Sequence, residues 1–274
     1  MRQHGRLRTG RGLGLHDHAC WTYGDDAEFR AAILDFLDDG ARAGNRLIYV
    51  GGDPAEKLRR DLDDLDGVDS LIGDGALQIL SLSGVHRAGA AIDAEARLAA
   101  YVAATDPAVE DGYTGLRVAA AATGLVAEPE MWAAHSRWES LADRYIASRP
   151  LAAMCLYDRR ELPDALLADI AAVHPASHAP PTMVPFRVYS QPDALMLEGE
   201  VAYFSADALR RLLPMTPQDD GEVVLDLSGL GFVDHHGVMA LVEHARKFRL
   251  QRTLRFQKVP YRVERLCDVM GVSL

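Results

Sequence analysis

Residues 226–245 read DLSGLGFVDHHGVMALVEHA, and this stretch decides the fold of the C-terminal part of the chain. The apolar run EVVLDLS, which overlaps its start, has the length and composition of a buried strand. A loop with two adjacent histidines follows, and Gly237 opens a segment whose apolar residues recur at helical spacing. These apolar residues are Val238, Leu241, Val242, Ala245 and Phe248. A strand that passes through a short loop into an amphipathic helix predicts an α/β domain.

The segments around this stretch predict the rest of a small domain. FRVYSQ and ALMLEG have the pattern of a hairpin, and SADALRRLL that of a short helix capped by Ser205. After the central motif, TLRFQKV is typical of another strand and YRVERLCDVMGV of a last helix. Together, residues 187–274 form a unit of ordinary domain size.

A proline-rich stretch marks the boundary of this domain. Residues 174–186 read HPASHAPPTMVPF and contain four prolines. Because proline lacks an N–H donor and disfavours helix in the residue before it, we expect an extended linker. We therefore divide the chain into residues 12–175, a linker at 176–186, and residues 187–274.

The first region alternates helical and strand-like segments. The helical pattern DDAEFRAAILDFLDDGARAG, with Asp25 or Asp26 as its N-cap, precedes the buried strand RLIYVGG, and the alternation continues to LPDALLADIAAV. Alternation of this kind predicts a parallel sheet with helices on both faces. The fold class is α/β in both regions.

Composition narrows the classes of function. The net charge is −11, and residues 187–274 carry 11 basic and 12 acidic side chains, so nearly all of the excess is in residues 1–186. A net acidic chain argues against nucleic acid as the main partner. The local basic run of Arg2, Arg6, Arg8 and Arg11 is expected to be a disordered tail.

The cysteine count and hydropathy indicate the compartment. Cys20, Cys155 and Cys267 are far apart in the sequence, and this low, odd number is typical of a reducing cytoplasm. No apolar stretch reaches the length of a membrane span, and no signal peptide is evident. We expect a cytoplasmic protein.

The stretch LGLHDHACWTYGDD, residues 13–26, is the richest in reactive side chains. His16, His18 and Cys20 alternate, so they would project from one face of an extended strand. Imidazole and thiolate are suitable ligands for zinc, copper or haem iron. The alternative is a buried strand in which these residues are only packed and hydrogen-bonded.

Within this stretch, residues 18–23, HACWTY, fit the HxCxxY signature of the MEDS sensory domain, which the chain resembles through most of residues 12–175. YVGGDP and MCLYDRRELP extend the resemblance. It implies a RecA/KaiC-like parallel sheet flanked by helices, and sensing of small compounds of hydrocarbon-like or one-carbon type.

The ATPases related to that family bind phosphate through a GxxxxGK[ST] loop. This chain has no GK[ST], and no lysine precedes Lys57. Nucleotide hydrolysis is therefore not expected, although an inactive nucleotide-binding relic is a further alternative. The resemblance places another ligand at the former phosphate site, lined by His18, Cys20 and Tyr23. His16 is a further candidate there, and Trp21 is a candidate apolar wall.

Residues 187–274 resemble a STAS domain, the fold of anti-sigma-factor antagonists. In that family the corner after the central strand reads D-S-S-G or D-S-T-G, and a kinase phosphorylates the hydroxyl before the glycine. Asp234 and Gly237 match, but His235 and His236 take the hydroxyl positions. The corner therefore cannot accept phosphate from a serine kinase, and two readings stay open, a partner-binding surface or histidines that only cap and pack. Ser228 is a further hydroxyl in this motif.

These observations predict a signalling protein that is not an enzyme. Its first domain would sense a small ligand, and its second would bind an anti-sigma factor or a related regulator. The chain could also form a homodimer, and we expect no direct contact with nucleic acid or membrane. The alternative is a metal- or haem-binding sensor or metalloenzyme that uses His16, His18 and Cys20.

Overall fold

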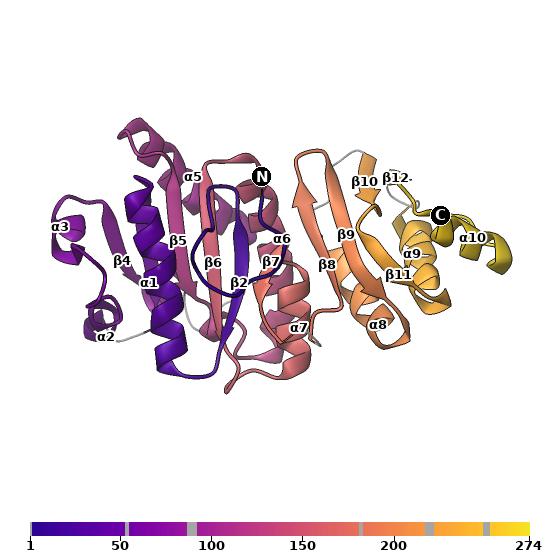
Figure 1. Cartoon of the computed structure of the whole chain (residues 1–274), viewed down its shortest axis with the longest axis horizontal. Helices are drawn as coiled ribbons and strands as arrows, with labels where there is room; N and C mark the ends of the chain where they lie inside the picture. The colour runs from indigo at the N-terminus through magenta and orange to yellow at the C-terminus, as the bar shows by residue number, and fades with distance from the viewer. Residues whose placement is uncertain (1, 53–54, 87–91, 181–182, 217–221, 249–252) are drawn as a thin grey trace.

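The computed structural model describes the chain except for residues 1, 53–54, 87–91, 181–182, 217–221 and 249–252. Two α/β units lie side by side along the long axis of the molecule (Figure 1). In the part of the chain that the structure describes, no helix is both long enough and apolar enough to cross a membrane.

The first unit is built on a seven-stranded parallel sheet with the strand order β1-β7-β2-β6-β5-β3-β4. Its strands are β1 (Gly5–Arg6), β2 (His18–Tyr23), β3 (Arg46–Gly51), β4 (Leu77–Ser81), β5 (Leu116–Ala121), β6 (Leu151–Asp158) and β7 (Ala176–His178). The central strands β2 and β6 are buried along their whole length, as expected for strands with helices on both faces.

Helices cover both faces of this sheet. One face packs against α1 (Asp26–Arg42), α2 (Ala55–Arg60) and α3 (Val68–Gly73), and the other against α5 (Ala94–Glu110), α6 (Trp132–Ser148) and α7 (Asp164–Ala172). The short helices are α4 (Leu82–Val85), η1 (Thr123–Leu125) and η2 (Pro129–Met131). Asp25 caps α1, because its side chain accepts a hydrogen bond from Glu28 N at 2.8 Å.

The second unit has a five-stranded sheet in which β11-β9-β10-β12 are parallel and β8 pairs antiparallel with β9. Its elements are β8 (Phe186–Gln191), β9 (Ala194–Val201), α8 (Tyr203–Leu212), η3 (Leu213–Met215), β10 (Glu222–Asp226), β11 (Leu230–Val233), α9 (His235–Phe248), β12 (Thr253–Gln257) and α10 (Tyr261–Met270). The predicted hairpin is the β8–β9 pair. The mixed sheet and its helices confirm the α/β class.

Two segments differ from the expectation. Residues 176–178, placed in the linker, form β7 and pair with both β1 and β2. The basic N-terminal run is also ordered, since Gly5–Arg6 is strand β1 and the Arg2 side chain forms an ion pair with Asp143. Both differences come from pairing across more than a hundred residues, which local composition does not reveal.

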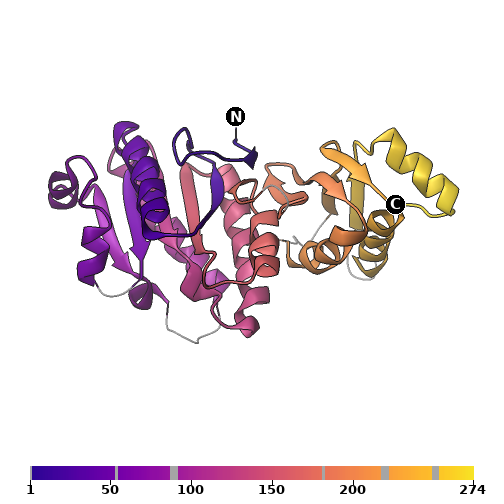
Figure 2. The same ribbon diagram turned by 60° about the horizontal axis from the view of Figure 1, so that its bottom comes forward.

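The two units pack against each other through α6, α7 and β8. Ala172 and Val173, at the end of α7, belong to the hydrophobic core of the second unit. Arg211 forms an ion pair with Asp169 at 2.9 Å across the junction. The N-terminal segment lies close to this junction in both views of the molecule (Figure 2). Arg2 reaches both units there, because its guanidinium donates to Asp143 and to the carbonyl of Ser190 in β8.

Candidate functional site: a buried polar cluster beside an apolar pocket

Strand β2 distributes the predicted ligand residues over two faces of the sheet. His18 and Cys20 face α6 and α7, whereas Trp21 and Tyr23 face α1, where Tyr23 contacts the Phe29 ring at 4.8 Å between centroids. The period of two along a strand requires this separation. The predicted pocket of His18, Cys20 and Tyr23 is therefore not formed.

His16 also lies apart from His18. It occupies the turn before β2 with φ 75°, and its Nδ1 is 3.3 Å from Ile146 O. Because the segment is not extended at His16, the alternation assumed for His16, His18 and Cys20 breaks there. These three residues do not form a common ligand set.

The connection between β2 and α1, where related ATPases have their phosphate-binding loop, also differs from the expectation. Residues 18–23 are themselves the first central strand, and only Gly24 and Asp25 separate β2 from α1. Arg159 covers Gly24 and forms an ion pair with Glu28 at 2.9 Å. A two-residue connection leaves no room for the phosphate-binding loop of an ATPase.

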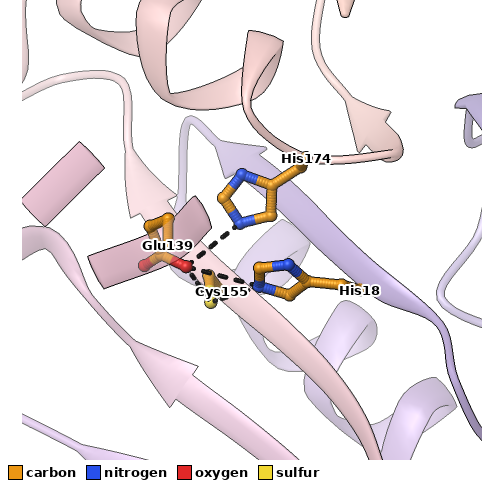
Figure 3. A group of neighbouring side chains, drawn as sticks. All are labelled: His18, Glu139, Cys155 and His174. Atoms are coloured by element: carbon orange, nitrogen blue, oxygen red, sulfur yellow. Dashed lines mark hydrogen bonds and ion pairs between the residues drawn. The ribbon is translucent and has the colours of Figure 1, made fainter. Parts of the chain in front are cut away.

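Instead, His18 meets three residues from distant parts of the chain. Figure 3 shows His18 of β2, Glu139 of α6, Cys155 of β6 and His174, just after α7, pointing toward one another. One potential ligand atom from each lies within 4.8 Å of the others, and all four residues are buried.

Glu139 is the centre of this group, which we call the buried cluster. Its Oε2 lies 3.3 Å from His18 Nε2, 3.4 Å from His174 Nε2 and 3.6 Å from Cys155 Sγ. Cys155 Sγ is also 3.6 Å from His18 Nε2. The other oxygen, Oε1, accepts a hydrogen bond from the Tyr157 hydroxyl at 2.9 Å and lies 3.0 Å from His135 Nε2.

The outer nitrogens of the two cluster histidines have acceptors of their own. His18 Nδ1 lies 3.2 Å from Asp143 Oδ1, and His174 Nδ1 lies 2.8 Å from the carbonyl oxygen of Ile170. Since a carbonyl oxygen only accepts, His174 Nδ1 must carry the proton. Its Nε2 therefore presents a lone pair to the cluster whenever the ring is neutral.

Burial and charge set the protonation states. Burial opposes ionisation of Glu139, but the histidines, led by His135, hold its pKa well below the usual value. Burial also opposes charge on His18, yet the bonds to Asp143 and Glu139 raise its pKa. Burial, and then the charge of His18, lowers the pKa of His174. The surroundings thus favour an ionised Glu139 and a charged His18, and they disfavour charge on His174.

Cys155 stays a thiol in this environment. Burial and the neighbouring carboxylate of Glu139 raise its pKa well above the usual value. Its register partner Cys20 is also buried, and burial raises the pKa of that thiol too. Neither cysteine is a nucleophile without a further cation, because the thiolate is the reactive form.

An apolar pocket of about 490 Å³ adjoins the cluster. Glu139 and Cys155 line it together with side chains from β3, β4, β5, α5 and α6. Its apolar lining includes Ile48, Val50, Leu80, Tyr101, Ala104, Val118 and Trp138. A largely apolar cavity with a few convergent polar groups is the usual form of a small-molecule site.

Of the four cluster residues, only His18 was predicted as a ligand. His174 begins the proline-rich stretch that predicted an extended linker, but it is buried, and its ring centroid is 4.2 Å from that of His18. On α6, the residues His135, Glu139 and Asp143 recur every four positions and are buried. A polar stripe at helical spacing among apolar residues is the signal that could have identified this face.

In the second unit, the Asp-His-His-Gly corner has a capped helix geometry. Asp234 Oδ1 accepts from Gly237 N at 3.0 Å and Oδ2 from Tyr203 N at 2.8 Å, which joins the starts of α9 and α8. A Cβ on Gly237 would lie 2.6 Å from Val201 O. Asp234 and Gly237 therefore have structural roles.

The two histidines of the corner lie at the surface. His235 is exposed and His236 is half-buried; their ring centroids are 4.0 Å apart, and His236 also contacts the Tyr203 ring. Tyr203 and the next residue, Phe204, together with Phe232 of β11 just before the corner, are large aromatic side chains with 74%, 71% and 49% exposure. Exposed aromatic groups of this size are typical of interaction surfaces.

Ser228 does not share this corner. It is exposed in the turn between β10 and β11, where its N–H donates to Asp226 Oδ1 at 2.8 Å. The four residues of β11 separate it from Asp234, a span of about 13 Å. The predicted partner-binding set is thus divided between two ends of one strand.

The comparisons with known proteins match both units. The model of the MEDS family, the methanogen/methylotroph DcmR sensory domain, matches residues 17–175, and a Mlab-type STAS domain model matches residues 186–273. Among solved structures, the flagellar accessory protein FlaH from Methanocaldococcus jannaschii is similar, with 13% identity and a TM-score of 0.37. That alignment covers 65% of this chain and 72% of FlaH. A search of curated proteins found no match.

Proposed function

Since the chain belongs to the MEDS family and carries a STAS domain after its MEDS domain, we propose that it senses a small apolar ligand and transmits binding to a regulatory partner. Both domain types support a role in signalling. The observation that carries the proposal is the apolar pocket of about 490 Å³ that ends on Glu139 and Cys155. We propose further that the protein is not an enzyme and acts in the cytoplasm.

The size and lining of the pocket favour one class of ligand. Small-molecule pockets commonly measure about 300 to 1,000 Å³, so this one suits a compound of several carbon atoms rather than a one-carbon compound. Its aliphatic and aromatic walls favour a hydrocarbon-like body. One polar or halogen group on the ligand would face the buried cluster.

A chain of contacts connects the pocket to the STAS domain. Glu139 lines the pocket and lies 3.3 Å from His18, whose other ring nitrogen lies 3.2 Å from Asp143. Asp143 Oδ2 in turn accepts a hydrogen bond from Ser190 N of β8 at 2.7 Å. A ligand that displaces Glu139 or α6 would therefore change the support of the first STAS strand. This contiguous network is the proposed route of coupling.

The proposed partner surface is the corner at Asp234–Gly237 with its exposed aromatic neighbours. Aromatic side chains at the centre of an interface supply much of its binding energy. Because His235 and His236 replace the hydroxyls, serine phosphorylation cannot regulate this surface. Control by a ligand in the MEDS domain would take its place, and an anti-sigma factor or a related regulator is the proposed partner.

Ligand binding can be tested by fluorescence, because Trp138 lines the pocket. 1-Bromohexane is expected to quench tryptophan emission saturably through its heavy atom. The variant Ala104→Phe fills the pocket and should abolish this quenching. Ala27→Phe, on the exposed side of α1 at the other face of the sheet, is the matched control and should leave it unchanged. Wild-type protein that shows no saturable quenching would contradict the proposal.

The partner is tested separately with purified anti-sigma factors. Binding is measured by calorimetry with and without 1-bromohexane, and a change in affinity of about tenfold is expected from a typical coupling energy. Phe204→Ser, which removes an exposed aromatic group, should weaken the complex. Equal partner affinity with and without 1-bromohexane would contradict the proposed coupling, even if the pocket binds this ligand.

A further inference from the structure

The donor atoms of the buried cluster are spaced as in a tetrahedral metal site. Zinc binds nitrogen and oxygen at about 2.0 to 2.2 Å and thiolate sulfur at about 2.3 Å, so tetrahedral ligands lie about 3.3 to 3.6 Å apart. Glu139 Oε2 lies 3.3 Å from His18 Nε2 and 3.4 Å from His174 Nε2, and Cys155 Sγ lies 3.6 Å from both Glu139 Oε2 and His18 Nε2. Four of the six edges of the tetrahedron match.

His174 supplies an independent indication. Its ring is fully buried, yet its Nε2 has no hydrogen-bond partner among the residues that the structure describes. Because Nδ1 donates to Ile170 O, Nε2 of the neutral ring carries a lone pair, and this lone pair faces the Glu139 carboxylate. Two electron-rich atoms 3.4 Å apart in a dry interior repel each other unless a cation lies between them.

The groups behind the four donors also suit a metal site. Metal-bound histidines usually donate their second N–H to a carboxylate or a carbonyl oxygen. His18 has Asp143 in that position and His174 has the Ile170 carbonyl. Tyr157 and His135 hold Oε1 of Glu139, which leaves Oε2 for the ion.

From this geometry we propose that His18 Nε2, Glu139 Oε2, Cys155 Sγ and His174 Nε2 bind a divalent first-row transition-metal ion, with Zn²⁺ as the best fit. Two nitrogens, one oxygen and one sulfur suit Zn²⁺ and Co²⁺ better than Mg²⁺ or Ca²⁺, which select oxygen. This inference goes beyond the proposed ligand sensing and does not depend on it.

Charge and access are consistent with this assignment. Ligation requires the Cys155 thiolate and an unprotonated His18 Nε2, so that one carboxylate and one thiolate balance the charge of the cation. Glu139 and Cys155 line the apolar pocket, which gives the ion a path to the otherwise buried donors. With four protein ligands, the ion would fix β2, β6, α6 and the end of α7 relative to one another.

Cobalt is the direct probe, because tetrahedral Co²⁺ absorbs visible light and a Co–thiolate bond adds a charge-transfer band in the near ultraviolet. Metal-free full-length protein titrated with Co²⁺ should bind one equivalent and show both features. Excess Zn²⁺ should remove them by replacing Co²⁺. Protein that binds no Co²⁺ at equimolar concentration, or binds it without the charge-transfer band, would overturn the proposal.

Two variants and a matched control assign the ligands. Cys155→Ser should lose the charge-transfer band, whereas Cys20→Ser, on the neighbouring strand and the same face of the sheet, should retain it. His174→Gln should weaken Co²⁺ binding at least tenfold, with circular dichroism reporting whether the fold is intact. A charge-transfer band that persists in folded Cys155→Ser, or wild-type affinity in His174→Gln, would overturn the assignment.

Discussion

In the part of the chain that the structure describes, two pairs of histidine rings are in contact, and the pairs differ in burial and in sequence separation. The rings of His18 and His174 have centroids 4.2 Å apart, and those of His235 and His236 are 4.0 Å apart. The first pair is separated by most of the MEDS domain in sequence and is buried. The second pair is adjacent in sequence and lies at the surface of the STAS domain.

The difference shows what gives an imidazole a defined chemical role. The buried pair has carboxylates and a carbonyl within hydrogen-bonding distance, which fix the orientation of each ring and decide its charge. In the surface pair, His235 is exposed and His236 packs against the Tyr203 ring. The second pair is visible in the sequence because its histidines are adjacent, but only the first pair is buried beside charged partners that set its chemistry.

The largest change in unfolding free energy is expected when Asp143, the hydrogen-bond partner of His18, is removed. Asp143→Ala would leave the Arg2 guanidinium and the Ser190 N–H without their shared acceptor and would remove the partner of His18. Breaking a buried pair of this kind costs about 3 to 5 kcal/mol of unfolding free energy, which urea denaturation would measure. Asp207→Ala removes an exposed pair with Arg210 and is the control, with a change below about 1 kcal/mol. Similar losses in both variants would show that the buried network adds nothing.

His244 is half-buried, between the buried and the exposed histidine pairs, and its protonation should make the free energy of unfolding depend on pH. Burial, with a smaller contribution from Lys247, lowers its pKa from 6.5 to about 4. The unfolded chain therefore binds a proton below pH 6.5 that the folded chain binds only near pH 4, so stability falls as the pH drops through this window.

We expect His244→Gln to reduce that loss by about 1 kcal/mol between pH 7.5 and pH 5.5, as measured by chemical denaturation. Carboxylates elsewhere in the chain also titrate in acid, and the difference between variant and wild type cancels their contribution. An identical pH dependence in the two proteins would mean that His244 titrates normally in the folded state.

The smallest effect is expected at the surface pair. The double change His235→Ser and His236→Ser restores the hydroxyl pattern of the antagonist corner and should alter the free energy of unfolding by less than about 0.5 kcal/mol. Asp234 and Gly237, which hold the helix start, are unchanged in this variant. A loss above about 1 kcal/mol in thermal or urea unfolding would show that the histidines belong to the fold after all.

The sequence was sufficient for the families and the α/β class, because both depend on local patterns and short motifs. Strand β2, the β8–β9 hairpin and the capped start of α1 follow from alternation, helical spacing and an Asp before the helix. The buried cluster was not predictable in the same way. His18 was identified, but Glu139, Cys155 and His174 join it only because β6, α6 and the end of α7 are brought together by the parallel sheet. The proposed grouping with Tyr23 failed on the strand period itself.

The contact of Asp143 and Arg2 with Ser190 has a consequence for how such proteins can be recombined. On the STAS side it uses only the main-chain N–H and C=O of residue 190, and the side chain takes no part in either bond. Any residue other than proline offers both groups. This contact therefore tolerates sequence change at position 190, whereas the Arg211–Asp169 ion pair and the packing of Ala172 and Val173 tie the junction to particular side chains. A chimera that exchanges the second half of the chain would keep the main-chain contact wherever a strand follows the same path, but it would also need a surface that covers Ala172 and Val173.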